Sequence, residues 1–61
     1  MTEITSKELT ALSDLLAMEQ NLVAKYSACA RDTHDAALKN RYEEIAARHQ
    51  EHFDRLYSSL K

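Results

Sequence analysis

The sequence contains neither glycine nor proline in 61 residues. Tight strand hairpins usually need glycine or asparagine in their turns, and irregular loops depend on both glycine and proline. The chain is instead rich in alanine, leucine, glutamate, lysine and arginine, which all favour helices. The absence of the two breakers therefore predicts an all-α fold built from long, uninterrupted helices.

The first predicted helix spans about residues 5–31. Thr5 and Glu8 match a capping box at its start, in which the side chain of each accepts a hydrogen bond from the backbone N–H of the other. Apolar residues then recur at spacings of three and four, which is typical of one buried helix face. Near the middle of this face stand Glu19 and Tyr26.

The apolar period fails at a polar stretch, which predicts a turn at about residues 32–35. Asp35 can cap a second helix over about residues 36–60, with Asp32 and Thr33 as alternative caps. Such a short link makes the two helices antiparallel neighbours, so residues 1–61 form one helical-hairpin domain. The outer face of the second helix is charged, and Glu51 and Arg55 have the spacing of an ion pair.

A chain this short is marginally stable on its own, and small domains usually need a disulfide, a metal ion or self-association. The single cysteine, Cys29, rules out an internal disulfide. The apolar faces are also broader than two helices can cover. We therefore expect a homodimer, or a higher oligomer, in which hairpins pair into a four-helix bundle. The expected core and dimer seam consists of Leu12, Leu16, Glu19, Val23, Tyr26, Tyr42, Ile45, His49, His52, Phe53 and Leu56.

Three members of this seam are polar. In an antiparallel hairpin that turns near Thr33, residue 19 lies level with residues near 48, so Glu19 and His49 should meet, with His52 one turn further along at the edge. One interpretation is a buried hydrogen-bonded cluster that fixes register. A second is a metal site, since carboxylate and imidazole ligands suit zinc, iron or manganese. A third is that His52, and even His49, faces water.

Other functional classes are not indicated. The net charge is -2 and lysine and arginine do not cluster, so no nucleic-acid surface is expected. No apolar run approaches the roughly 20 residues of a membrane span, and the polar segment Met1–Lys7 does not resemble a signal peptide. We therefore expect a cytoplasmic protein. Cys29 has no evident activating base, and neither a Ser-His-Asp arrangement nor a phosphate loop is present, so the chain is not expected to be an enzyme.

A longer pattern runs through both predicted helices. It consists of Lys7-Glu8-Leu9-x-x-Leu12-x-Asp14-Leu15-Leu16, then Glu19 and Tyr26, and after the turn Asp35-x-x-Leu38-Lys39 and Ala46-x-x-His49-x-x-His52-Phe53-x-x-Leu56. This pattern resembles the spore coat F-like, ferritin-like helical proteins of spore-forming Gram-positive bacteria. The resemblance implies half of a ferritin-like bundle, an association with spores, and partners among other spore or helical proteins.

The resemblance also bears on the three polar residues. Each half of a ferritin-like di-iron protein supplies a Glu from one helix and a Glu-x-x-His from the next. Glu19 would match the first carboxylate and His52 the histidine, whereas His49 stands where the pattern has Glu. A dimer would then hold two carboxylates instead of four, too few to neutralise two divalent ions. We expect no cofactor, or a single divalent ion (zinc, iron or manganese).

The leading functional hypothesis from the sequence is a small, non-enzymatic protein that self-associates and is related to spore coats. One alternative is a vestigial ferritin-like bundle that binds metal through Glu19, His49 and His52. Another is a helical adaptor that docks onto a larger partner.

Overall fold

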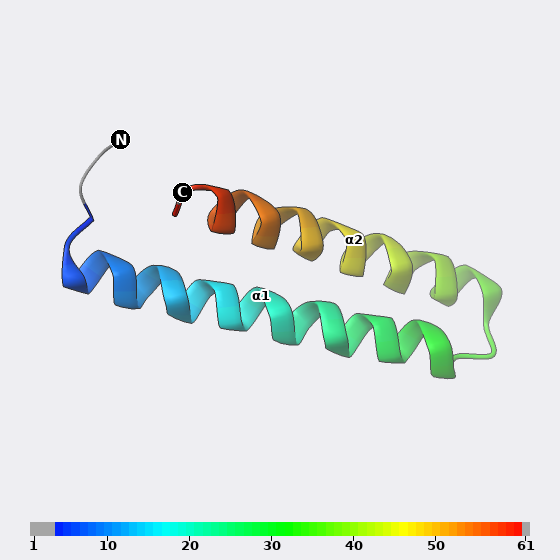
Figure 1. Cartoon of the computed structure of the whole chain (residues 1–61). Coiled ribbons are helices and arrows are strands. Elements are labelled where there is room, and N and C mark those ends of the chain that lie inside the picture. The colour runs from blue at the N-terminus through cyan, green and yellow to red at the C-terminus, as the bar shows by residue number, and fades with distance from the viewer. Residues whose placement is uncertain (1–3, 61) are drawn as a thin grey trace.

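Two α-helices, packed side by side in opposite directions, make up the fold (Figure 1). The structure is a computed structural model that describes residues 4–60. Helix α1 spans Ser6–Asp32 and helix α2 spans Ala36–Ser58. The hairpin measures 47 × 16 × 11 Å. The predicted all-α antiparallel hairpin is thus confirmed, while α2 ends two residues before the predicted boundary. The predicted domain of residues 1–61 and the first three residues of the segment Met1–Lys7 extend beyond the described residues.

Side chains cap the start of both helices. The Glu8 backbone N–H donates to Thr5 Oγ1 over 3.1 Å, and the Thr5 N–H donates to Glu8 Oε1 over 3.3 Å, so the predicted capping box is confirmed. At α2, Asp35 is the cap and accepts a 3.0 Å hydrogen bond from the Leu38 N–H. Thr33 instead ends α1, and its hydroxyl accepts from the Asp35 N–H over 3.2 Å. The three-residue turn therefore satisfies backbone groups at both helix ends.

The contact between the helices is thin. Among the described residues only two small side chains are buried, Ala30 and Ala46, at 5% and 8% exposure. Of the residues expected in the seam, His52 is exposed. The other ten are partly buried, namely Leu12, Leu16, Glu19, Val23, Tyr26, Tyr42, Ile45, His49, Phe53 and Leu56. The helices thus meet along the expected stripe without enclosing a fully buried large side chain in the described range.

Much apolar surface is left uncovered by the hairpin itself. Large hydrophobic side chains with 42–51% exposure are Ile4, Leu9, Leu15, Met18, Leu38 and Tyr57. The total accessible surface is 4948 Å². A compact monomer of the same mass would expose about 4,000 Å². The excess reflects the elongated shape of the hairpin.

Two further observations concern charge and hydropathy. Within residues 4–60, neither helix is long and apolar enough to cross a membrane. The expected ion pair between Glu51 and Arg55 does not form. The ion pairs within residues 4–60 join Arg31 to Asp32, and Glu19 to His49 and His52. An exposed i,i+4 pair gains little from closing, so open side chains at this spacing are physically reasonable.

Candidate functional site

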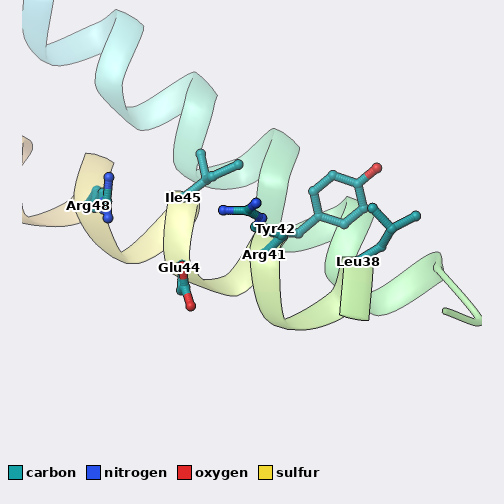
Figure 2. A pocket seen from close by; sticks show the side chains of 6 residues that line it. All are labelled: Leu38, Arg41, Tyr42, Glu44, Ile45 and Arg48. Carbon is teal, nitrogen blue, oxygen red and sulfur yellow. The ribbon is translucent and has the colours of Figure 1, made fainter. Parts of the chain in front are cut away.

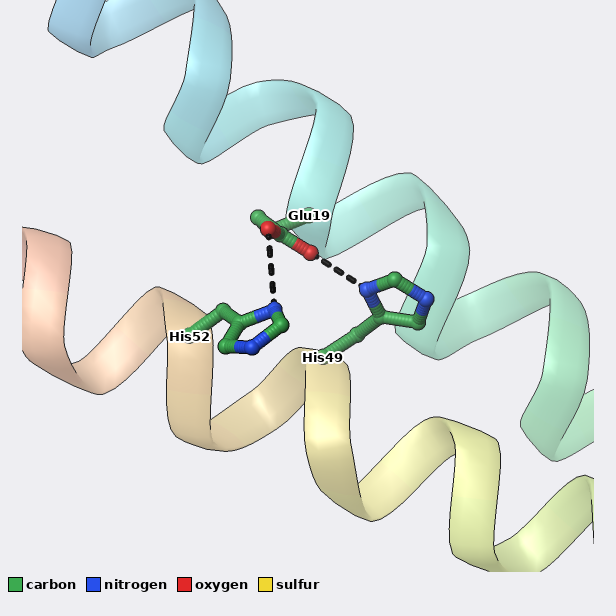
Figure 3. Close-up of polar contacts among 3 residues, drawn as sticks. All are labelled: Glu19, His49 and His52. Carbon is green, nitrogen blue, oxygen red and sulfur yellow. Dashed lines mark hydrogen bonds and ion pairs between the residues drawn. The ribbon is translucent and has the colours of Figure 1, made fainter.

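The three polar residues of the seam come together at mid-length of the hairpin (Figure 3). Glu19 projects from α1, while His49 and His52 project from α2. A spacing of three residues places both imidazoles on one side of α2. The turn at residues 33–35 sets the register that brings residue 19 level with this pair. The predicted meeting of Glu19 and His49 is confirmed.

One carboxylate contacts both imidazoles. His49 Nδ1 lies 2.6 Å from Glu19 Oε1, and in the tautomer with hydrogen on Nδ1 it donates to that oxygen. His52 Nδ1 lies 3.4 Å from the other oxygen, Oε2. Each imidazole thus approaches its own oxygen of the carboxylate (Figure 3). A carboxylate removed from water needs such partners, because an unpaired buried charge is strongly unfavourable.

Exposure rises across the cluster from α1 outward. The Glu19 side chain is 12% exposed, that of His49 is 25% exposed and that of His52 is 52% exposed. His52 therefore lies at the edge of the seam, as expected from its position one turn beyond His49. The cluster is closed on the Glu19 side and accessible to solvent on the His52 side.

Aromatic rings hold the His49 imidazole in place. The Tyr26 ring stacks on it with centroids 6.3 Å apart and an interplanar angle of 13°. The His52 ring meets it edge-on at 5.8 Å and 80°. Tyr42 in turn lies 6.1 Å from Tyr26. The stacking of Tyr26 on His49 was not predicted, although one signal for it existed. Tyr26 follows Glu19 by seven residues and His49 follows Tyr42 by seven, so the two pairs share faces of their helices.

The cluster has the composition and spacing of a metal site. One ligand atom from each of Glu19, His49 and His52 can be chosen so that all three lie within 4.8 Å of one another. In tetrahedral zinc sites, bonds of 2.0–2.1 Å place neighbouring ligand atoms about 3.3 Å apart. The distances from Nδ1 to the carboxylate, 2.6 and 3.4 Å, lie on either side of this value. These residues could therefore hold a divalent ion after a small adjustment of side chains.

Three shallow hollows lie on the same side of the hairpin as His52. One, of about 310 Å³, adjoins the cluster and is lined by Leu15, Glu19, His52, Arg55 and Leu56. A second shares Leu15 and continues along α1, and it is lined by Ile4, Glu8, Ala11, Leu12 and Leu15. A third lies on α2 nearer the turn, and Figure 2 shows the side chains that line it, Leu38, Arg41, Tyr42, Glu44, Ile45 and Arg48.

Helix geometry joins these hollows into one surface. Leu38, Ile45 and His52 are seven residues apart, as are Arg41, Arg48 and Arg55, and residues seven apart share a side of a helix. The third hollow therefore faces the same way as the first. We call this surface the grooved face and define it by Ile4, Leu12, Leu15, Leu38, Ile45 and Leu56.

The remaining candidate side chains stand apart from the cluster. His34 is exposed in the turn, and Cys29 is a partly buried free thiol near the end of α1. Neither belongs to the group of residues that could share a metal ion. The site is thus confined to Glu19, His49 and His52, with Tyr26 as its aromatic wall.

No family model, curated protein or solved structure matches the chain.

Proposed function

We propose that this chain is a non-enzymatic, self-associating protein whose hairpin pairs with a second copy to form a four-helix bundle. The observation that carries the proposal is the lack of a core within the hairpin, where only Ala30 and Ala46 are buried among the described residues. Leu15 and Leu38 remain 43% and 45% exposed on the grooved face. A second hairpin laid on this face would cover them and complete a core between four helices.

The exposed area has the size that such a pairing needs. The surface of 4948 Å² exceeds that of a compact monomer of this mass by about 900 Å². Each partner in an interface of standard size buries roughly 800 Å². Covering the grooved face once would therefore bring the exposed surface close to that of an ordinary folded chain.

The charges beside the grooved face favour a second copy as the occupant. Along α2, Arg41, Glu44, Arg48, Glu51 and Arg55 alternate in sign at spacings of three and four residues. None of the five forms an ion pair within residues 4–60. Two copies of α2 running antiparallel could place Arg48 opposite Glu51 of the partner subunit, and the symmetric contact would repeat the pair. An alternating row of this kind complements itself, as a twofold interface requires.

The test is a matched pair of variants on α1. Leu15→Glu places a carboxylate where two hollows of the grooved face meet. Ala17→Glu places the same charge two residues away, on the opposite side of α1 and exposed to solvent. We expect the wild type and Ala17→Glu to have the mass of two chains by light scattering at micromolar concentrations. Leu15→Glu should shift the mass toward that of one chain.

Two outcomes would contradict the proposal. One is a wild-type chain that is helical by circular dichroism and has the mass of a single chain at these concentrations. The other is a chain that aggregates or stays poorly folded alone, which would instead support an adaptor that docks onto a larger helical partner.

The setting we propose is a structural one in spores. It rests on the resemblance to spore coat F-like proteins of a pattern that runs from Lys7 to Tyr26 and, after the turn, from Asp35 to Leu56. Self-association is the property that a coat component would need, and the proposed partners are further copies of the chain and other helical spore proteins.

Metal binding is a second candidate function, favoured by the Glu19, His49 and His52 cluster. The cluster is compact, its ligand atoms lie within 4.8 Å, and its His52 side is open to solvent. In the ferritin-like interpretation, the pairing of two hairpins would hold two such sets in one bundle. Zinc, iron and manganese are the ions that these ligand types suit.

A further inference from the structure

We infer that Glu19, His49 and His52 form a site for one zinc ion per chain, and that the ion clips α1 to α2 and thereby controls the stability of the hairpin. The inference rests on the second candidate function, metal binding. It adds the identity of the ion, its stoichiometry and the consequence of binding.

Two histidines and one glutamate are a known zinc ligand set, and the same set also holds a single ferrous ion. Manganese prefers sites rich in carboxylates and water, whereas imidazole suits zinc well. A di-iron site of the bundle type uses two carboxylates from each hairpin, and this cluster supplies one. One carboxylate offsets half of the charge of one divalent ion, so the cluster of one chain can hold a single ion and lacks the carboxylates of a two-metal centre.

The arrangement of the three side chains needs little change to accept the ion. Both Nδ1 atoms already point to the same carboxylate (Figure 3). An ion between them would replace the hydrogen that His49 shares with Glu19, and the 2.6 Å separation would open to about 3.3 Å, the spacing of tetrahedral zinc ligands. The stacked Tyr26 ring limits rotation of His49, which favours a preset imidazole.

The position of the site makes an ion there a clip between helices. Glu19 lies fourteen residues before Thr33, and His49 lies fourteen residues after Asp35. The turn joins the helices at one end of the hairpin (Figure 1). The cluster links them at mid-length, fourteen residues from that turn along each helix. Because the hairpin buries few side chains, a bond to both helices would add a large share of its stability. In small domains the free energy of metal binding becomes free energy of folding.

His52 gives the ion access to solvent. Its side chain is 52% exposed and borders the hollow lined by Leu15 and Arg55. Three protein ligands leave the fourth position of a tetrahedral zinc ion open to water. In the unpaired hairpin the ion could therefore enter from the grooved face without unfolding of the helices.

The test is a zinc titration of metal-free protein, followed by calorimetry and by thermal melts in circular dichroism. All proteins carry Cys29→Ser, so that the free thiol cannot compete for the ion. We expect one zinc per chain and a higher melting temperature with zinc, because a ligand that binds the folded state stabilises it. His49→Gln and His52→Gln should each weaken zinc binding by at least about tenfold, since even the outer partners of metal ligands contribute 10–100-fold.

His34→Gln is the matched control, because it removes an exposed histidine outside the cluster. It should bind zinc as the parent does. Loss of binding in His34→Gln, unchanged binding in His49→Gln, or absence of binding to the parent would each overturn the inference. Binding that leaves the melting temperature unchanged would overturn the claim that the ion stabilises the hairpin by linking α1 to α2.

Failure of this inference is distinguishable from failure of self-association. Light scattering of the same samples in a chelator reports the mass of the metal-free protein. A two-chain mass without zinc binding would leave the bundle proposal standing and remove the zinc site. Zinc binding by a chain that stays a monomer would leave the zinc site standing and remove the bundle proposal.

Discussion

At the scale of single residues, Glu19 is the side chain on which the cluster depends. It is 12% exposed and contacts both histidines, so it is the least hydrated of the three and has the most partners. A hydrogen bond to a charged group contributes about 1.5–3 kcal/mol. Leaving a mostly buried carboxylate without a partner costs a similar amount or more. Whether burial of Glu19 stabilises the hairpin therefore depends mainly on His49, because its Nδ1 lies closer to the carboxylate than that of His52 does.

A double-mutant cycle tests this pairing in metal-free protein. His49→Leu should lower the free energy of unfolding by about 1–3 kcal/mol, because Glu19 then keeps only the longer contact to His52. Adding Glu19→Leu should recover most of that loss, because two apolar side chains replace both partners of the hydrogen bond. Urea denaturation followed by circular dichroism measures all four proteins. Equal stability of His49→Leu and the wild type would show that the bond contributes nothing net, as some partly buried pairs do.

At the scale of elements, the helices follow from local signals and their meeting follows from chain geometry. Two capped starts and a failed apolar period predicted α1 and α2 to within about two residues. Counting residues from the turn predicted that Glu19 and His49 meet, because the rise per residue is fixed in an α-helix. Whether Glu51 and Arg55 form an ion pair could not be predicted, because an exposed pair contributes too little free energy to hold both side chains in one conformation. The Tyr26 contact with His49 depends on ring orientation, which spacing alone does not determine.

The cap of α2 offers a prediction at this scale. Asp35→Ala should lower the free energy of unfolding by about 0.5–2 kcal/mol, because the Leu38 N–H loses its acceptor. Asp35→Asn retains a side-chain oxygen and should cost much less. Urea denaturation of the two variants under identical conditions provides the measurement. Equal losses for alanine and asparagine would show that the charge of Asp35, and not its hydrogen bond, stabilises the helix start.

At the scale of the whole molecule, the hairpin is a thin rod, and the two side chains buried within residues 4–60 are both alanines. Alanine brings little apolar area, so burial within one chain contributes modestly to stability. Larger side chains such as Leu15 and Leu38 remain about half exposed. A broad apolar face has the same sequence pattern whether a second copy of the chain or a different helical protein covers it, so the pattern predicts a partner without naming it.

Self-association predicts that stability depends on protein concentration. If folding and pairing are linked, the melting temperature of the wild type should rise as the protein is concentrated, because mass action favours the dimer. Leu15→Glu should melt at a temperature that does not vary with concentration, and Ala17→Glu should behave as the wild type does. Thermal melts by circular dichroism over a wide concentration range provide the measurement. A wild-type melting temperature that is constant over that range would speak against a linked dimer.

The stacking of Tyr26 on His49 has a practical consequence. The chain has no tryptophan, so its ultraviolet emission comes from three tyrosines. One of them, Tyr26, lies against the imidazole of the cluster and beside the ring of Tyr42. The protein therefore carries its own optical probe, and its native fluorescence should report the state of the cluster without any label.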